Sequence, residues 1–407
     1  MSIHLPMPHM VPALKRVADW QLEHIDPVLS LAGIALLSLG LVMVGSASIS
    51  VADRNLSSPF YYLERQGVYM LIGIAAALLV YRVRLVHWEK SGMVLLGFSL
   101  FLLLLVLIPG VGKAVNGSTR WLPLGVFNFQ VSEAVKLFLI VYVAGYLVRH
   151  GDEVRRSIWG FIKPMVMVGI AGLLLLLEPD FGATVVIIGT VLAMMFLGGV
   201  RFQQFVSFLL LFGGAALLLV VTSPYRMQRL TSFLNPWADP YNSGFQLTQS
   251  LIAIGTGGWF GSGLGGSVQK LFYLPESHTD FLFAVLSEEL GFAGVCVVIG
   301  LYTLLFWRTT QIGLQAEKCG NRFAAYLAYG IGIWLASQAL INMGVNMGLL
   351  PTKGLTLPLM SYGGSSLIIC CMAIGLLLRI HLECGIPAKQ AVVRGRYSDA
   401  AGGGLAR

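Results

Sequence analysis

The sequence predicts an all-α integral membrane protein with about ten transmembrane helices, both termini in the cytoplasm, and one large extracytoplasmic loop between helices 7 and 8. Three observations predict this class. Only 11% of the 407 residues are charged, 56% are hydrophobic, and apolar stretches recur along the whole chain. Soluble globular proteins carry about a quarter of charged residues. A soluble enzyme is therefore excluded.

Ten apolar stretches approach the ~20 residues that a helix needs to cross a bilayer. Lysine and arginine accumulate in short cytoplasmic loops. With both termini inside, 18 of the 27 lysines and arginines are cytoplasmic and eight are outside, and Lys136 lies within the fourth stretch. The net charge of +8 is thus a topology signal and does not indicate nucleic acid binding. The stretches are residues 28–50, 66–81, 91–109, 129–147, 161–177, 182–199, 204–222, 281–306, 323–343 and 361–382.

The chain divides into a cytoplasmic tail (1–26), a membrane domain (27–383) and a second cytoplasmic tail (384–407). Five cysteines fall in the spans or on the inner side, so we expect neither a disulfide framework nor a zinc site. The loop at 223–279 is rich in aromatic residues that favour burial, which argues against disorder. Long ordered loops often carry function.

Two segments of this loop have recognisable patterns. Residues 242–254 have apolar side chains at helical spacing, which predicts an amphipathic helix. Seven glycines follow between 255 and 266. They form either a chain of turns or a flexible loop whose backbone approaches a bulky polar substrate. Their context argues against a dinucleotide site, because no buried strand precedes these glycines.

Several charged residues lie within or beside the spans, where charge is costly and often functional. Glu133 and Lys136 share one helix face and either neutralise each other or shape a polar cavity that opens outward. Asp180 lies in an outer hairpin at a comparable depth. Glu288 and Glu289 follow in the eighth span and need partners, for which Lys136 is one candidate.

The run from residue 273 to 281 places Glu276, His278 and Asp280 at the mouth of the eighth span. Asp280 is either an N-cap-like structural group, favoured by the helix dipole, or a functional acid. Another outer loop, at 109–127, holds Arg120 and Trp121, and a tryptophan there is often only an interfacial anchor. A third, at 349–360, offers Lys353 as a further cation.

Together these stretches resemble the SEDS family (shape, elongation, division and sporulation), and the division members more than the elongation members. The resemblance runs from the first span to Glu383, and Val131 replaces a proline that the family usually has. The most specific segments are Phe129 to Lys136, Glu178 to Gly182, Phe233 to Pro240, Gly263 to Lys270, Pro275 to Phe281 and Pro351 to Ser366.

The resemblance implies a septal peptidoglycan glycosyltransferase of the cell inner membrane that polymerises lipid II. It implies that Asp280 is the essential acid and that Trp121 is needed for activity. It also implies a class B penicillin-binding transpeptidase of the FtsI type as partner, and the division regulators FtsQ, FtsL, FtsB and FtsN. We expect no organic cofactor. From the resemblance and from the charge pattern together, we expect a set of substrate-binding residues. They are Lys270, Trp121, Arg120, Glu133, Lys136, Asp180, Glu276, His278 and Lys353.

Glycan extension from lipid II suits a single base. A sugar 4-hydroxyl attacks an anomeric carbon that carries diphosphate, and diphosphate leaves as a stable anion. One carboxylate that accepts the hydroxyl proton therefore suffices, whereas glycoside hydrolysis normally needs a carboxylate pair. We expect Asp280 to be that base in an inverting displacement of undecaprenyl diphosphate. Lys270, a divalent cation such as Mg²⁺ or Mn²⁺, and one of several further cations would balance the diphosphate charge, the candidates being Arg226, Arg229, Arg120 and Lys353.

Three hypotheses of different classes stay open from the sequence. The first is the glycosyltransferase with Asp280 as base, for which His278 is a weaker alternative. The second is a lipid II transporter, since many spans and buried charges also suit a transport path. The third is a scaffold that recruits and activates the transpeptidase through apolar outer loops.

Overall fold

The computed structural model describes residues 25–115, 118–123, 125, 128–351 and 354–384. Within these ranges, nine helices are long and apolar enough to cross a membrane, and the 17-residue α7 is a shorter apolar helix. The ten predicted spans fall on these ten helices, which confirms the all-α membrane class. The helices are α2 (Pro27–Leu56), α3 (Tyr61–Arg82), α4 (Leu85–Leu107), α5 (Val131–Arg156), α6 (Ile158–Leu177), α7 (Phe181–Leu197), α8 (Phe202–Val221), α9 (Pro224–Leu234), α10 (Phe245–Thr256), α11 (Leu282–Lys318), α12 (Arg322–Asn346) and α13 (Gly364–Cys384), with a 3₁₀ turn η1 (Pro236–Ala238).

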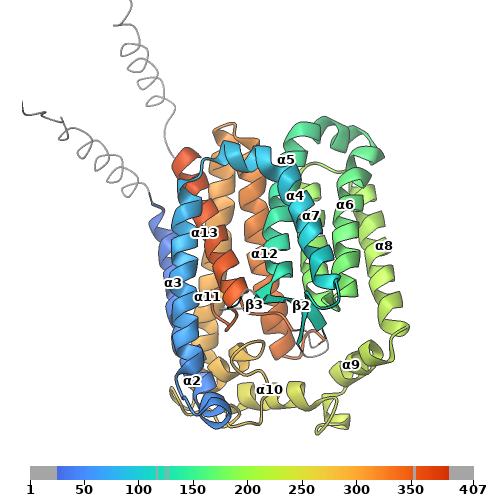
Figure 1. Cartoon of the computed structure of the whole chain (residues 1–407). Helices are drawn as coiled ribbons and strands as arrows, with labels where there is room; N and C mark the ends of the chain where they lie inside the picture. Colours follow the sequence, from blue (N-terminus) through green and yellow to red (C-terminus); the bar gives the residue numbers. More distant parts are fainter. Residues whose placement is uncertain (1–24, 116–117, 124, 126–127, 352–353, 385–407) are drawn as a thin grey trace, which may run out of the picture.

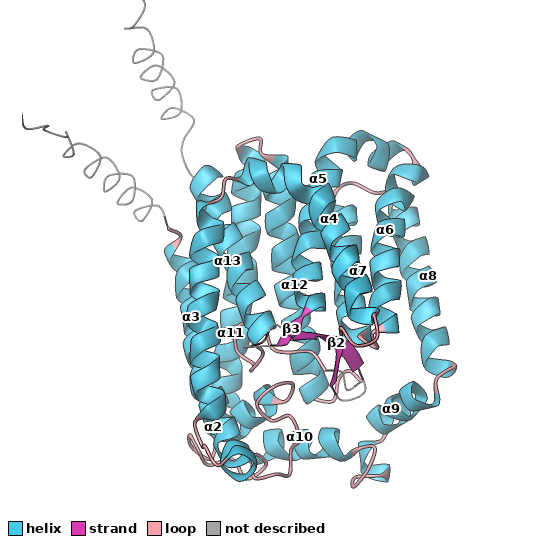
Figure 2. Ribbon diagram, viewed as in Figure 1, coloured by secondary structure: helices cyan, strands magenta, loops and turns pink. Residues whose placement is uncertain are grey.

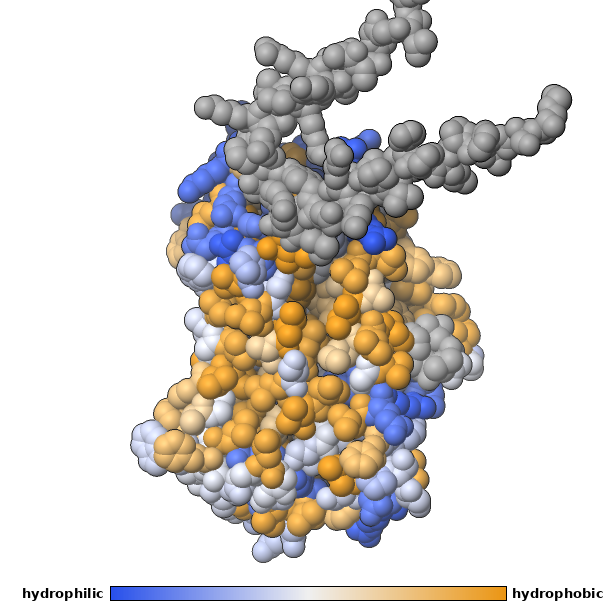
Figure 3. Space-filling model, turned by 90° about the vertical axis from the view of Figure 1, so that its left-hand side faces the viewer, coloured by the Kyte–Doolittle hydropathy of each residue, from blue (hydrophilic) through white to orange (hydrophobic). Residues whose placement is uncertain are grey.

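The long helices run side by side and form one bundle (Figure 1, Figure 2). The first four turns of α5 are buried on nearly every side, which requires apolar residues around the whole helix. By contrast, no residue of α8 is buried, and this helix lies at the rim of the bundle. Apolar side chains also predominate over the middle of the face shown in Figure 3. Such a surface suits contact with lipid.

The two ends of the described chain lie at the same end of the bundle. Asp26, which caps α2, accepts a hydrogen bond of 2.6 Å from Arg308 Nε and lies 3.7 Å from His381 near the end of α13. The strands, α9 and α10 lie at the opposite end, which we call the loop end (Figure 1). We expect the loop end to face the outside, as the distribution of lysine and arginine predicts.

Three short strands at the loop end were not predicted. They are β1 (Lys113–Val115), β2 (Ser118–Pro123) and β3 (Asn128–Gln130), and they form an antiparallel sheet in that order. Strands this short show too little alternation to be recognised in a sequence. The sheet leads directly into α5, whose first residue is Val131. A proline is tolerated at this first helical position, so the family proline and Val131 both suit the start of α5.

The amphipathic helix expected at 242–254 is present as α10, with Leu247 and Ala253 buried. The glycines after it have a structural role. At Gly291 the helix α11 is broken, with φ 63° and ψ −164°. The backbone amides of Ser262 and Gly263 donate to the carbonyls of Glu288 and Glu289, at 2.9 and 3.0 Å. The glycine-rich segment therefore satisfies backbone groups that the break in α11 exposes.

Replacing Gly291 by alanine is expected to destabilise the protein by about 2 kcal/mol or more, because this φ/ψ pair is nearly restricted to glycine. A Cβ atom there would also lie 2.3 Å from the amide nitrogen of Gly261. The thermal unfolding midpoint in detergent measures the effect. Gly300→Ala is the matched control, because a Cβ at this position of the same helix meets nothing within 4 Å. Equal midpoints for the two variants would contradict this account of the break.

The segment between α12 and α13 enters the bundle without forming a helix. Leu355, Leu357 and Met360 are buried, and the Tyr302 hydroxyl donates to the carbonyl of Pro358. Irregular backbone at membrane depth is tolerated where protein covers it or where it lines a polar cavity. This segment does both, because residues 354–356 line the cavity described next.

Candidate active site

A cavity of about 210 Å³ lies at the loop end of the bundle. Its walls come from β2, the starts of α5, α7 and α13, the segment before α11, and the segment after α12. Of the predicted site residues, six line it, namely Arg120, Trp121, Glu133, Asp180, Glu276 and Asp280. The fold therefore gathers residues that lie up to 160 positions apart in the sequence.

Asp280 is half-buried at the cavity, two residues before α11 begins. Two amides of α12 fix its backbone, because Nδ2 of Asn342 and Nδ2 of Asn346 donate to its carbonyl at 2.9 and 3.0 Å. A Cβ atom on Gly354 would lie 3.0 Å from Oδ2 of Asp280, so glycine leaves room for this carboxylate. The N-cap residue of α11 is Phe281, which makes no side-chain capping bond, so Asp280 does not act as the helix cap.

The surroundings of Asp280 favour its neutral form. Burial raises the pKa of this carboxyl to about 7, and the nearby Glu276 carboxylate contributes in the same direction. Arg120 opposes the shift. A carboxyl group with a pKa near the working pH combines the correct protonation state with a useful proton affinity, which suits a general base.

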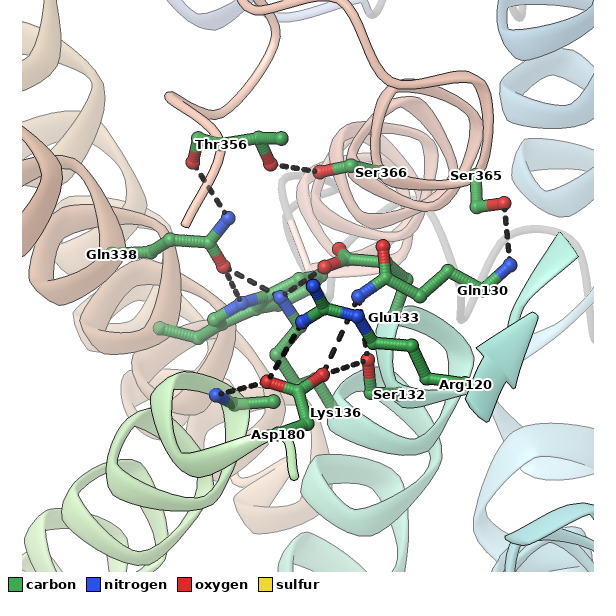
Figure 4. Close-up of polar contacts among 12 residues, drawn as sticks. Arg120, Gln130, Ser132, Glu133, Lys136, Asp180, Gln338, Thr356, Ser365 and Ser366 are labelled. Atoms are coloured by element: carbon green, nitrogen blue, oxygen red, sulfur yellow. Dashed lines mark hydrogen bonds and ion pairs between the residues drawn. The ribbon is translucent and has the colours of Figure 1, made fainter. Parts of the chain in front are cut away.

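The Asp180 carboxylate is held from four elements, and one of its contacts is a hydrogen bond of 3.4 Å from Gln130 Nε2 at the end of β3 (Figure 4). Its Oδ1 accepts from the amide of Ala183 at 3.1 Å and thereby caps α7, while the Ser132 hydroxyl donates to Oδ2 at 2.9 Å. Arg120 Nη1 lies 3.7 Å from Oδ1. The Arg120 side chain is 23% exposed, whereas that of Asp180 is 3% exposed. Asp180 therefore caps α7 and also pairs with the more exposed Arg120 at the cavity wall.

Glu178 lies at the end of α6, completely buried, and neither of its carboxyl oxygens has a hydrogen-bond partner among the described residues. Burial raises the pKa of this carboxyl to about 8, and Asp180 adds to the shift. At neutral pH the group is mostly protonated. This leaves Asp180 as the charged carboxylate that pairs with Arg120 in this turn.

Glu133 and Lys136 neutralise each other, and only Glu133 also lines the cavity. Lys136 Nζ donates to Glu133 Oε1 at 2.8 Å and to Gln338 Oε1 at 2.7 Å. Its ammonium lies 5.3 Å from the centre of the Trp334 ring. Lys136 is 1% exposed and does not line this cavity. The expected pairing of Lys136 with Glu288 or Glu289 is wrong, because Lys136 binds Glu133 and Gln338 and the two glutamates bind other groups.

Glu288 and Glu289 have partners in the segment between α10 and α11. Lys270 Nζ donates to Glu289 Oε1 at 2.8 Å and to the Ser46 hydroxyl at 2.9 Å. Glu288 accepts from the amide of Val268 at 2.9 Å. Among the described residues that line the cavity, Lys270 is not found. The structure therefore places Lys270 as a tether between the loop, α2 and α11.

The remaining predicted residues lie at the edge of the cavity or outside the description. Glu276 is exposed, lines the cavity and accepts from the Thr279 hydroxyl at 2.8 Å. His278 packs against the Tyr62 and Tyr362 rings, at 4.5 and 5.5 Å between ring centres. Burial lowers the pKa of His278, so its imidazole is neutral. Lys353 lies outside the described residues.

Sequence reasoning missed the polar row on α12. Gln338, Asn342 and Asn346 recur every fourth residue on an otherwise apolar helix, and they hold Lys136, the carbonyl of Asp280 and the segment after α12. That spacing places them on one face and was visible in the sequence. Gln130 and Tyr362 also line the cavity and were not singled out.

The described residues contain no group of three or more His, Cys, Asp or Glu that is arranged to hold a metal ion. Mg²⁺ is often bound by one or two carboxylates together with substrate phosphates. The carboxylates that line the cavity are Glu133, Asp180, Glu276 and Asp280, and each offers oxygen ligands of this kind.

Comparisons with known proteins identify the family of the chain. Residues 28–384 match the model of the FtsW, RodA and SpoVE family, described as cell cycle proteins. The chain is 62% identical over 361 residues to the "Probable peptidoglycan glycosyltransferase FtsW" of Thioalkalivibrio sulfidiphilus. The aligned region covers 89% of this chain and 90% of that protein. A protein of the same name from Legionella pneumophila is 58% identical over 348 residues, covering 86% and 88%.

Two solved structures share the fold. One is described as "Structural coordination of polymerization and crosslinking by a peptidoglycan synthase complex". It matches with a TM-score of 0.72 and 32% identity, and the match covers 88% of this chain and 98% of that one. The other is the rod shape determining protein RodA of Thermus thermophilus, with a TM-score of 0.66 and 31% identity over 88% and 97%.

Proposed function

Because this chain belongs to the FtsW, RodA and SpoVE family of cell cycle proteins, and is a peptidoglycan glycosyltransferase, we propose that Asp280 is its general base. One observation carries the proposal. Asp280 lines the same cavity as Arg120 and Trp121, and burial brings the pKa of its carboxyl to about 7. The substrate is lipid II, and the product is a glycan strand.

The reaction follows from the groups at the cavity. Asp280 accepts the proton of the attacking 4-hydroxyl while the new bond to the anomeric carbon forms and the bond from that carbon to the diphosphate oxygen breaks. The electron pair of the broken bond leaves with undecaprenyl diphosphate, and the configuration inverts. Arg120 is exposed enough to contact that diphosphate, and its planar guanidinium suits phosphate oxygens.

We also propose that the protein works in the cell inner membrane at the division septum. Its partners there are a class B transpeptidase of the FtsI type and the regulators FtsQ, FtsL, FtsB and FtsN. The likeness to the polymerase of a peptidoglycan synthase complex supports a transpeptidase partner. A divalent cation brought in with the diphosphate would reduce its negative charge.

A transporter and a scaffold are the competing functions. Four carboxylates and Arg120 line the cavity at the loop end, whereas no charged side chain among the described residues lines the apolar cavity around Ile25 and Tyr81 near the opposite end. Alternating access needs polar routes to both sides. Purified protein mixed with lipid II, with and without its transpeptidase, separates the three. Polymer supports the glycosyltransferase. If lipid II crosses the vesicle membrane and no polymer forms, the protein is a transporter. If no polymer forms but the protein still stimulates crosslinking by the transpeptidase, it is a scaffold.

The rate of polymerisation is expected to depend on pH through Asp280. Its pKa of about 7 means that the carboxyl is protonated below pH 7 and cannot accept the hydroxyl proton. The rate should fall about tenfold per pH unit below this value and level off above it. A profile of kcat/KM against pH measures this. Glu276→Gln removes a charge that raises the pKa of Asp280, so it should shift the inflection to lower pH. A flat profile in both proteins would contradict the assignment.

A further inference from the structure

A cluster of aromatic side chains adjoins the cavity on the side of α3. We call Tyr61, Tyr62, His278 and Tyr362 the aromatic wall. The ring centres of Tyr61 and Tyr62 are 5.3 Å apart, those of Tyr62 and Tyr362 are 5.1 Å apart, and both pairs are edge-to-face. His278 is buried against two of the rings, while the three tyrosines are half-buried. The wall therefore presents ring surface to the outside.

The aromatic wall is continuous with the active site. Tyr362 lines the cavity together with Asp280, and its amide donates to the carbonyl of His278 at 3.0 Å. Glu276, which also lines the cavity, lies two residues before His278, whose ring packs against that of Tyr62. A long molecule that leaves the cavity past Tyr362 would next meet Tyr62 and then Tyr61.

The charges of the cavity are distributed unevenly. Arg120 lies on β2. In Figure 1, α3, which carries Tyr61 and Tyr62, lies on one side of α13, and β2 lies on the other side. The diphosphate of the donor is attracted to the guanidinium of Arg120. On the other side, the guanidinium of Arg65 lies 4.6 Å from the centre of the Tyr61 ring and brings one positive charge to the aromatic wall. The rings of Tyr62 and Tyr362 suit the apolar faces of sugars.

We propose that the aromatic wall binds the sugar backbone of the growing glycan strand as it leaves the cavity. The inference rests on the proposed polymerisation of lipid II. The wall does not take part in bond formation, because it lies outside the reacting groups. By slowing dissociation of the strand between additions, it increases the number of sugars added before release. The structure thus predicts a residue set that controls product length.

Product length from purified lipid II, measured by gel electrophoresis with the transpeptidase present, tests the proposal. Tyr62→Leu removes the ring and should shorten the product about two- to tenfold, the factor that one aromatic contact contributes to strand dissociation. Tyr62→Phe keeps the ring and should keep the length near that of the parent. Tyr241→Leu is the control for rate and length, because Tyr241 is 85% exposed in the loop between η1 and α10 and does not line the cavity.

Each outcome decides the matter. A shorter product from Tyr62→Leu, with Tyr62→Phe and Tyr241→Leu both at the parent length, supports the aromatic wall. Parent-length product from Tyr62→Leu overturns it, and so does equal shortening by Tyr62→Leu and Tyr62→Phe, which would assign the effect to the hydroxyl group. Failure of the proposed function is a separate result, since the parent protein would then make no polymer at all.

Discussion

Replacing Asp280 by asparagine is expected to lower the rate of glycan polymerisation by about 10²- to 10⁴-fold, the usual contribution of a general base. Asparagine has nearly the same size, so the cavity and the contacts of the Asp280 carbonyl with Asn342 and Asn346 should persist. What is lost is the oxygen that accepts the proton. Polymer formed from purified lipid II, in the presence of the transpeptidase, measures the change.

The matched control is Asp53→Asn. Asp53 is an exposed carboxylate of α2, close to the loop end, and it does not line the cavity. Its removal changes the net charge by the same amount as Asp280→Asn and should leave the rate near that of the parent. If both variants polymerised at the parent rate, Asp280 would be a structural residue and the base would have to be sought elsewhere.

Replacing Lys136 by methionine is expected to lower the free energy of unfolding by about 3 to 5 kcal/mol, the cost of leaving one member of a buried ion pair alone. Glu133 is 4% exposed and would lose the ammonium that lies 2.8 Å from its Oε1. Chemical or thermal unfolding of the purified protein in detergent measures the loss.

Two further variants show whether the loss comes from the unpaired charge. Lys136→Met combined with Glu133→Leu removes both charges and should recover much of the stability, because apolar residues often replace a buried pair at little cost. Lys163→Met breaks a pair with Glu153 in which the lysine side chain is 56% exposed, so it should cost less than about 1 kcal/mol. A double variant as unstable as Lys136→Met would argue that the lost stability comes from packing.

The spans and the cavity acids could be predicted from the sequence for a simple reason. Crossing a bilayer imposes a length and a composition on each helix, and these are local properties of the chain. Asp280, Glu133 and Asp180 stood out because charges are rare beside apolar segments. Their meeting in one cavity followed from placing each near the same side of the membrane.

The partners of the buried charges could not be predicted in the same way. Lys270 reaches Glu289 only because α11 is broken at Gly291 and the glycine-rich segment packs against the break. No local feature of the sequence of α11 indicates that break, because glycine is common in membrane helices. The extension of α11 to Lys318 was missed as well, because its last turns carry charges that end an apolar stretch.

The central claim is that Asp280 accepts the proton of the attacking sugar hydroxyl. The single-turnover rate of Asp280→Asn with lipid II bound at saturation tests it most directly, because it separates chemistry from substrate binding. The account predicts that lipid II still binds and that the rate of glycosidic bond formation falls by about two orders of magnitude or more. A variant that binds lipid II and forms the bond at the parent rate would contradict it.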